Sequence, residues 1–269
     1  MSLRIQNNLE AFNAHRQLTN TASQQSKAME KLSSGFRINR ASDDAAGLAI
    51  SQKLSAQVSG LDQAQRNAAD AISLVQTGEG AMAEVHSMLQ RVRDLAVQYN
   101  NGTLSSSDQT AITDEVAQLC AEVSRIGSDT KFNGIALLTG SSSISFQVGS
   151  EDGQTISVSA VSLFGSGGEV ESSVFSFSGT VNISNIDTAI NNVSSARSTF
   201  GSIQNRLEHT INNLATLQEN TQAAASRIKD VDMAKEMVNF TKLSILQQAG
   251  TSMLAQANQS SQGVLGLLR

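Results

Sequence analysis

The stretch LRIQNNLEAFNAHRQLTNTASQQSKAMEKLSSGF, residues 3–36, predicts a long amphipathic helix that no proline interrupts. Its larger apolar residues recur mostly at steps of three and four, which places them on one face of a helix. These residues are Ile5, Leu9, Phe12, Leu18, Ala22, Met29, Leu32 and Phe36. A helix with a one-sided apolar stripe is stable only when another element covers that stripe. A partner helix is therefore expected elsewhere in the chain.

That partner is predicted at the other end, where residues 233–269 repeat the pattern. The second stripe comprises Met233, Met237, Phe240, Leu243, Leu246, Ala257, Val264 and Leu267. Pairing the two ends closes a loop of roughly 200 residues, which costs about 4 to 5 kcal/mol. Ordering the helices costs about 1 to 2 kcal/mol more for each residue. We therefore predict that both ends stay mobile in the isolated chain and fold when neighbouring copies cover them.

The middle of the chain predicts a rod of three further helices. Ser42 followed by Asp43 and Asp44 is typical of a helix cap with acidic residues in the first turn. The apolar stripe that follows continues until the helix-stopping pair Asn101-Gly102. A rod of this kind has its own core once the helices fold back on one another.

Two capping patterns mark the other helices of the rod. Ser105 with Asp108 predicts the start of a shorter helix, and Ser184 with Asp187 predicts the start of a long return helix. The return helix carries its apolar stripe as far as Val231. Both helices are expected to pack against the first one.

Between these helices the periodicity becomes alternating, which indicates strands. Alternating apolar residues flank the turn Glu151-Asp152-Gly153 and predict a β-hairpin, namely Ile144, Phe146 and Val148 before it and Ile156 and Val158 after it. A second alternation of Phe175 and Phe177 against Val181 and Ile183 predicts a small exposed hairpin or a loop.

The predicted fold class is mainly α, an elongated helical rod with a small β-hairpin region plus a terminal coiled-coil pair. Residues 1–42 with 233–269 form the coiled-coil pair, and residues 43–165 with 184–232 form the rod. Residues 166–183 form a short variable loop or hairpin. The chain has no Pro, no Trp and one Tyr, which favours long helices with small-residue interfaces.

Charge and composition restrict the function classes. The net charge is −5, yet residues 1–40 hold six Lys/Arg against two Glu, which leaves the middle strongly acidic. Basic charge spread over a helix favours a solvated face over a nucleic-acid site. No apolar run is long enough for a membrane span, and the N-terminus has no apolar signal core, so we expect no membrane insertion and no cleavable signal peptide.

Catalytic patterns are missing from the sequence. His15, His86 and His209 each stand alone on a predicted helix, without a second ligand at metal spacing. The acidic pairs at Asp43 and Asp230 are explained by capping and junction polarity, and a single cysteine, Cys120, permits no internal disulfide. We expect no enzyme, no metal and no cofactor.

Several fragments resemble one family closely. The stretches SSGFRINRASDDAAGLAIS, LQRVRDLAVQ, KFNGIALL and SILQQAGTSMLAQANQSSQGVLGLLR are similar to bacterial flagellin, and the resemblance covers residues 1–160 and 184–269. It implies a structural subunit that self-polymerises into the flagellar filament used for swimming, is exported unfolded by the flagellar type III system and is secreted. Implied partners are further copies of the chain, the flagellar cap and hook-associated proteins, and an export chaperone at the C-terminal helix.

The resemblance also implies roles for individual residues. The filament core would be formed by Ile5, Leu9, Phe12, Leu32, Phe36, Met237, Phe240, Leu246, Val264 and Leu267. Arg91, Leu95 and Glu122 match positions through which an animal toll-like receptor recognises flagellins, and axial packing between neighbouring subunits is the alternative role of Arg91. Larger relatives insert outer domains where this chain has only a short segment. A hook–filament junction protein of the same family remains the alternative function.

Overall fold

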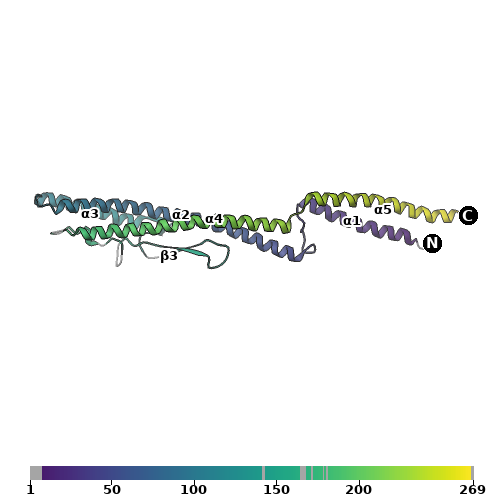
Figure 1. The fold of residues 1–269 in the computed structure, drawn as a ribbon, viewed down its shortest axis with the longest axis horizontal. Coiled ribbons are helices and arrows are strands. Elements are labelled where there is room, and N and C mark those ends of the chain that lie inside the picture. The colour runs from purple at the N-terminus through teal and green to yellow at the C-terminus, as the bar shows by residue number, and fades with distance from the viewer. Residues whose placement is uncertain are drawn as a thin grey trace. The chain divides into compact units, whose positions relative to one another are not determined.

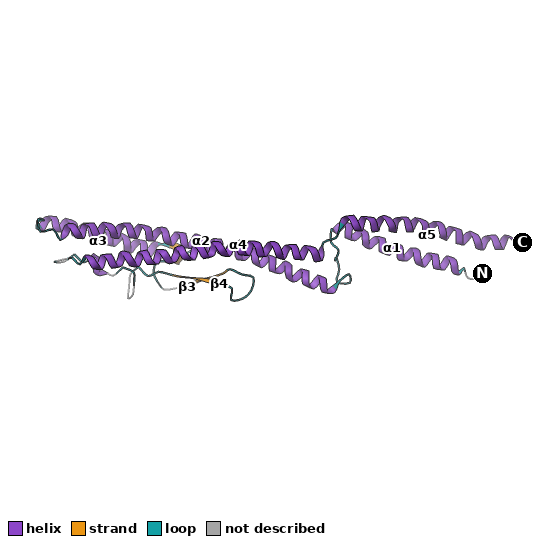
Figure 2. Ribbon diagram, in the orientation of Figure 1, coloured by secondary structure: helices purple, strands orange, loops and turns teal. Residues whose placement is uncertain are grey.

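The computed structural model describes residues 8–140, 143–163, 168–170, 172–177, 179 and 181–267. The chain divides into two compact units, residues 1–56 with 220–269 and residues 57–219. Long helices dominate both units, with a small hairpin in the second and a paired helix from each chain end in the first (Figure 2). The predicted fold class, mainly α with a β-hairpin and a terminal helix pair, is confirmed.

The first unit is built on two helices that run side by side, α1 (Leu9–Ser34) and α5 (Met233–Leu267) (Figure 1). The pairing is antiparallel, because Asn8 Nδ2 donates to the carbonyl of Ala257 at 3.0 Å while Phe36 and Asp230 form an antiparallel bridge at the opposite end. The terminal helix pair predicted from the sequence is therefore present within one chain.

The contact between α1 and α5 has a heptad pattern. The partly or fully buried residues of α5 alternate at steps of four and three, and they are Glu236, Phe240, Leu243, Gln247, Gly250, Leu254 and Ala257. The matching residues of α1 alternate at steps of three and four, and they are Ala11, Ala14, Leu18, Thr21, Gln25, Ala28 and Leu32. Such spacing defines a coiled-coil seam, along which each side chain enters a gap in the facing helix.

The seam differs from the two stripes predicted from the sequence. Leu9, Phe12 and Met29 lie outside it and are exposed, and Phe12 is 79% exposed. Val238, at 71%, and Ile245 are also exposed, so the apolar residues of α5 surround the helix rather than forming one face. The prediction that the two apolar stripes pair with each other is wrong for Leu9, Phe12 and Met29, because two closely packed helices leave room mainly for small side chains and a few leucines.

The connector between α1 and α2 (Ala45–Tyr99) is held by main-chain contacts to the end of α4 (Ile183–Lys229). Gly35 ends α1 with a left-handed φ of 74°, and its N–H bonds to the carbonyl of Lys31 at 2.9 Å. Val231 N–H then donates to the carbonyl of Gly35 at 3.0 Å, and Arg37 N–H donates to the carbonyl of Lys229 at 2.7 Å. These bonds join the residues that follow α1 to the residues between α4 and α5 as an isolated antiparallel bridge.

The capping residue of α2 lies two residues later than predicted. Asp44 is the capping residue, because its Oδ1 accepts the N–H of Gly47 at 2.8 Å, and Ser42 lies in the preceding turn. Asp43 accepts the N–H groups of Arg40 and Asn39, and these bonds hold the pKa of its carboxyl below the usual value. A Cβ on Gly47 would lie 2.7 Å from Ile38 Cδ1, so a larger residue there would require the Ile38 side chain to shift.

The second unit has a continuous core between α2, α3 (Ser106–Asp129) and α4. Its largest fully buried side chains come mainly from α2 and include Met82, Leu89, Leu95 and Val85. Gly78 lets α4 approach closely, because a Cβ there would lie 3.0 Å from Phe200 Cε2. The three packed helices of the predicted rod are present.

Capping follows the predicted pattern for α3 but not for α4. Ser105 and Asp108 form a reciprocal capping box at the start of α3. At the start of α4, Asn182 Oδ1 accepts the N–H of Ser184 at 3.1 Å, so Asn182 is the capping side chain. Asp187 instead binds Arg93 of α2 at 2.6 Å. The prediction that Ser184 caps α4 is wrong, because the helix begins one residue earlier.

The predicted hairpin consists of β3 (Ser143–Gln147) and β4 (Thr155–Ser159), with Ile144 opposite Val158 and Phe146 opposite Ile156. A second, two-residue hairpin, β1 (Lys131–Phe132) with β2 (Ile135–Ala136), was not predicted from the sequence. Its turn places Asn133 and Gly134 at positive φ, of 48° and 81°. Asn-Gly is the preferred pair for such a turn.

The described residues of the segment before α4 pack into the core instead of projecting from it. Its described residues contain a short 3₁₀ helix, η1 (Ser172–Phe175), and they include the buried side chains Val174, Phe177 and Val181. Phe177 contacts Tyr99 edge to face, with ring centroids 5.5 Å apart. Of the two predicted alternatives, a hairpin or a loop, the described residues form no strand and agree with the loop, but several of its side chains are buried rather than exposed.

Candidate functional site

Exposed apolar side chains are concentrated in the first unit. Thirteen large apolar side chains are strongly exposed among the described residues, and ten of them lie in residues 1–56 and 220–269. Nine belong to α1 and α5, and we call these nine the terminal apolar surface: Leu9, Phe12, Met29, Met233, Met237, Val238, Ile245, Leu246 and Met253. Large exposed apolar areas on a protein mark sites that another molecule covers.

The predicted core-forming residues divide into three groups. Leu9, Phe12, Met237 and Leu246 belong to the terminal apolar surface. Leu32, Phe36 and Phe240 are half-buried within the unit itself. Ile5 lies outside the described residues, and so do the side chains of Val264 and Leu267.

Phe36 has a local role in the connector. The Nζ of Lys229 lies 4.1 Å from the centre of its ring, an arrangement in which the cation is attracted to the aromatic face. Arg37 adds a bond from Nη2 to the carbonyl of Ile228 at 2.6 Å. These contacts join α1 to the end of α4, so Phe36 stabilises the connector in addition to any contact with other molecules.

The two units carry opposite net charge. Residues 1–56 with 220–269 hold twelve Lys/Arg against seven Asp/Glu, a net charge of +5. Residues 57–219 hold seven Lys/Arg against seventeen Asp/Glu, a net charge of −10. Copies of either unit therefore repel one another at low ionic strength, and the repulsion is stronger for the acidic unit because its net charge is larger.

The three residues matched to receptor recognition lie in different environments in the structure. Arg91 is exposed on α2 and forms an ion pair with Glu115 of α3 at 2.7 Å. Leu95 is only 1% exposed and belongs to the core. Glu122 binds Arg125 at 2.6 Å, which lowers the pKa of its carboxyl. Arg91 is thus brought together with Glu115 and not with Glu122.

Glu115 was missed because its proximity to Arg91 depends on the register between two helices. The helix α3 folds back along α2, and the sequence gives the direction of the helix but not its exact offset. A prediction based on an exposed Arg on α2 and an acidic residue on α3 leaves all five acidic residues of α3 as candidates, namely Asp108, Asp114, Glu115, Glu122 and Asp129. Only the packed structure selects Glu115.

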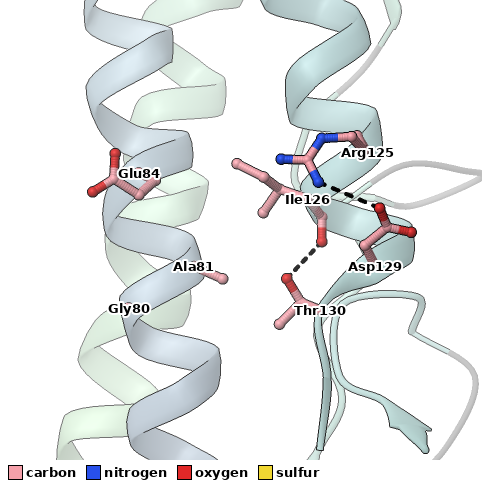
Figure 3. A pocket seen from close by; sticks show the side chains of 7 residues that line it. All are labelled: Gly80, Ala81, Glu84, Arg125, Ile126, Asp129 and Thr130. Carbon is pink, nitrogen blue, oxygen red and sulfur yellow. Dashed lines mark hydrogen bonds and ion pairs between the residues drawn. The ribbon is translucent and has the colours of Figure 1, made fainter.

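An open groove lies between α2 and α3, with a volume of about 350 Å³ (Figure 3). The α2 side contributes Gly80, Ala81 and Glu84, while α3 and the residue after it contribute Arg125, Ile126, Asp129 and Thr130. The ionic groups of α3 are already paired, since Arg125 contacts Asp129 at 3.4 Å (Figure 3). The side chains that line the groove are therefore not arranged as a catalytic site.

The histidines and the cysteine are dispersed. Within the described part of the chain, no group of three or more His, Cys, Asp or Glu side chains is arranged to hold a metal ion. His86 contacts Gln90 one turn away at 2.9 Å, and Cys120 is half-buried on α3, where burial raises the pKa of its thiol. Among the helices that the structure describes, none is long and apolar enough to cross a lipid bilayer.

Comparison with known families accounts for most of the chain. Residues 5–143 match the bacterial flagellin N-terminal helical region, and residues 183–268 match the bacterial flagellin C-terminal helical region. The chain belongs to the bacterial flagellin family. The matched regions contain both terminal helices and the three helices of the second unit, so the family resemblance noted in the sequence is confirmed.

Two curated flagellins match over nearly their whole length. The flagellin of Halalkalibacterium halodurans is 52% identical over 270 residues, covering 98% of this chain and 99% of the relative. The flagellin of Bacillus subtilis is 44% identical over 304 residues, covering 99% and 100%. The first relative therefore also has no large insertion between the two helical regions.

A solved structure supports the fold. The structure of a putative flagellar hook-associated protein from Vibrio parahaemolyticus matches with a TM-score of 0.59, covering 70% of this chain and all of that chain. Its sequence is only 17% identical, so the match concerns the fold alone. Flagellins are structural proteins of the bacterial flagellar filament, and membership of the family makes this chain a structural subunit of that filament.

Proposed function

We propose that the chain polymerises into the filament through its terminal helices and that neighbouring copies bury the terminal apolar surface. The observation that carries this proposal is the concentration of exposed large apolar side chains on α1 and α5. Contacts between different patches on identical copies generate an open helical assembly when the repeated rotation does not close into a ring. The terminal apolar surface supplies such patches on two antiparallel helices.

The composition of the seam supports the same proposal. Within one chain, α1 and α5 meet mainly through small or polar residues such as Ala14, Gln25 and Gly250. The nine side chains of the terminal apolar surface lie outside the seam, and burying each of them stabilises an assembly by about 1.5 to 3 kcal/mol. Most of the apolar stabilisation available to these helices thus arises only on contact with another copy.

Weak burial within the first unit also agrees with export of an unfolded chain. Only Ala28, Ile38 and Leu243 are buried apolar residues of the described first unit, apart from glycine. Segments with few buried apolar contacts open at low free-energy cost. We infer that the terminal helices are mobile before assembly, that the flagellar type III system exports the chain and that the cap and hook-associated proteins and a chaperone contact its ends. Hydrogen exchange on dilute subunit tests the mobility, and strong protection of α1 and α5 would contradict it.

We also propose that a toll-like receptor would recognise the second unit. The exposed guanidinium of Arg91, held by Glu115, offers a charged contact on the outside of α2. The buried Leu95 supports the helix beneath it. We propose that Arg91 with Glu115 forms the charged part of the receptor contact, so that Glu115 replaces Glu122 among the three matched residues.

The polymerisation proposal is tested by electron microscopy of purified protein after salt-induced polymerisation. The full chain should form filaments, and a chain lacking residues 233–269 should not. A matched pair of point variants is sharper, because Val238 and Val97 are both exposed valines, on α5 and on the second unit respectively. Val238→Ser should raise the lowest concentration that supports filaments, and Val97→Ser should not.

Filaments from the truncated chain, or equal effects of the two valine variants, would contradict the role of the terminal helices. Seeding separates the junction alternative from a filament subunit. A filament subunit should extend purified filament fragments into long fibres, whereas a junction protein should bind the fragment ends without extending them.

A further inference from the structure

The methionines of the chain divide sharply in exposure. Met29, Met233, Met237 and Met253 are between 47 and 65% exposed, and all four belong to the terminal apolar surface. In the second unit, Met82 is fully buried and Met88 is half-buried against the core. Met1 lies outside the described residues. Every strongly exposed methionine among the described residues therefore lies on α1 or α5.

Exposed methionine thioethers are oxidised by peroxides. A peroxide such as hydrogen peroxide transfers one oxygen atom to the sulfur, which loses two electrons and becomes a sulfoxide, while the O–O bond breaks and water leaves. The product replaces a flexible apolar side chain with a polar one that accepts hydrogen bonds. A buried sulfoxide without a donor opposite it is unfavourable.

We propose that these four methionines form an oxidation-sensitive switch on assembly, in which peroxide converts the free subunit to a form that no longer polymerises. The inference rests on the proposed function, because it requires neighbouring copies to bury the terminal apolar surface. It adds that the assembled filament is protected, since the same contacts that stabilise it exclude the oxidant. Oxidation would thus act on subunits before incorporation and spare those already in place.

Three of the four exposed methionines lie on α5, outside its contact with α1. Met233 and Met237 are one helical turn apart near the start of α5, and Met253 lies further along the same helix. None of the three belongs to the heptad seam with α1. Their oxidation should therefore leave the α1–α5 pairing within one chain intact and change only the surface offered to other copies.

Cys120 is the other side chain that peroxide could attack. The reactive form of cysteine is the thiolate, and burial raises the pKa of the Cys120 thiol, which keeps it protonated at neutral pH. A Cys120→Ala background removes this reaction altogether. Comparison of the parent and this background separates thiol oxidation from thioether oxidation.

The experiment treats dilute subunit with hydrogen peroxide, removes the peroxide and measures two quantities. Peptide mass spectrometry gives the sulfoxide fraction at each methionine, and sedimentation gives the lowest concentration that forms filaments. We expect sulfoxide at the four exposed methionines, none at Met82, and an increase of that concentration by about tenfold or more. Filaments treated in the same way should show little sulfoxide at the four positions.

The variant that tests the assignment carries Met29→Leu, Met233→Leu, Met237→Leu and Met253→Leu. Exchange of Met for Leu conserves volume and apolarity, so assembly should persist and become indifferent to peroxide. A Met82→Leu and Met88→Leu double variant is the matched control and should stay as sensitive as the parent. Methionine sulfoxide reductases should restore assembly of the oxidised parent.

Several outcomes would overturn the inference. Oxidised parent that polymerises at the original concentration, a fourfold variant that remains sensitive, or oxidised subunit that the reductases reduce without regaining assembly would each do so. If the fourfold variant fails to assemble before oxidation, the reductase experiment alone decides. Failure of untreated parent to form any filaments contradicts the proposed function instead, so the two failures are distinguishable.

Discussion

Leu18 of α1 packs directly against Gly250 of α5, so closely that a Cβ on Gly250 would lie 3.1 Å from Leu18 Cδ1. Gly250 occupies a seam position of the heptad pattern, between Gln247 and Leu254. Glycine is unfavourable in a helix interior by about 1 kcal/mol relative to alanine. Its presence here is explained by the close approach of the two helices.

Gly250→Leu should therefore separate the helices around Leu18 and destabilise the assembled filament. Overpacking of a close contact costs about 1 to 3 kcal/mol, which should lower the temperature at which filaments dissociate. Gly250→Ala is the control, because the end of the flexible Leu18 side chain can shift by a few tenths of an ångström. Filaments of the leucine variant that dissociate at the parent temperature would show that the seam is not formed in the filament.

Gly78 and Gly80 provide a matched pair on α2. A Cβ at Gly78 would contact the buried ring of Phe200 at 3.0 Å, whereas a Cβ at Gly80 meets nothing within 4 Å. Gly80→Ala should stabilise the second unit by up to about 1 kcal/mol through helix propensity, and Gly78→Ala should lose that gain to strain against Phe200. Thermal unfolding followed by circular dichroism compares the two, and equal shifts would argue against a close contact at Gly78.

The sequence predicts the elements of this fold better than it predicts their contacts. Helix lengths, the capping box at Ser105 and the hairpin around Asp152 follow from local patterns, and the structure confirms them. Those features depend on residues close together in the chain. The α1–α5 seam does not, because it uses Thr21, Gln25 and Gln247, which hydrophobicity alone would assign to solvent.

The same limit applies to the functional residues. Leu9 and Phe12 were correctly recognised as apolar positions on one helix, yet only the structure shows that they point away from the seam. Arg91 was identified from a local motif, while its partner Glu115 depends on helix register. Residue spacing shows which side chains share one face of a helix. The packing of the whole unit decides which neighbouring helix that face contacts.

Receptor activation tests whether Glu115, and not Glu122, acts together with Arg91. In a reporter-cell assay with soluble subunit, Arg91→Ala should weaken activation by about tenfold if the guanidinium is a central contact. Glu115→Ala should weaken it less, by up to about fivefold, because exposed ion pairs contribute up to about 1 kcal/mol. Glu122→Ala should leave it unchanged, since Glu122 pairs with Arg125. A stronger effect at Glu122 than at Glu115 would restore the original assignment.

Two carboxyl groups of the second unit should influence stability in opposite directions. Bonds from Ser105 lower the pKa of Asp108 below 3.8, so its stabilisation is present above that pH and is lost as the pH falls through the lowered value. Burial raises the pKa of Glu169 above 4.5, so its contribution is present at low pH and is lost as the pH rises through the raised value.

At neutral pH, Glu169→Gln should therefore raise the unfolding temperature of the second unit, because the buried charge is removed. Asp108→Asn should lower it and should reduce its dependence on pH below 3.8. Thermal unfolding recorded across the acidic range measures both effects. A Glu169→Gln variant that is less stable at neutral pH would show that the carboxylate has a favourable partner.

The contact between Tyr99 and Phe177 has a practical consequence for optical spectroscopy. The chain contains no tryptophan and one tyrosine, so its tyrosine fluorescence and much of its near-ultraviolet dichroism originate at a single ring. That ring lies where the buried segment before α4 closes over the end of α2. The chain thus carries an intrinsic chromophore that reports on folding of the second unit. A tryptophan introduced on α5 would provide a separate signal from the terminal helices.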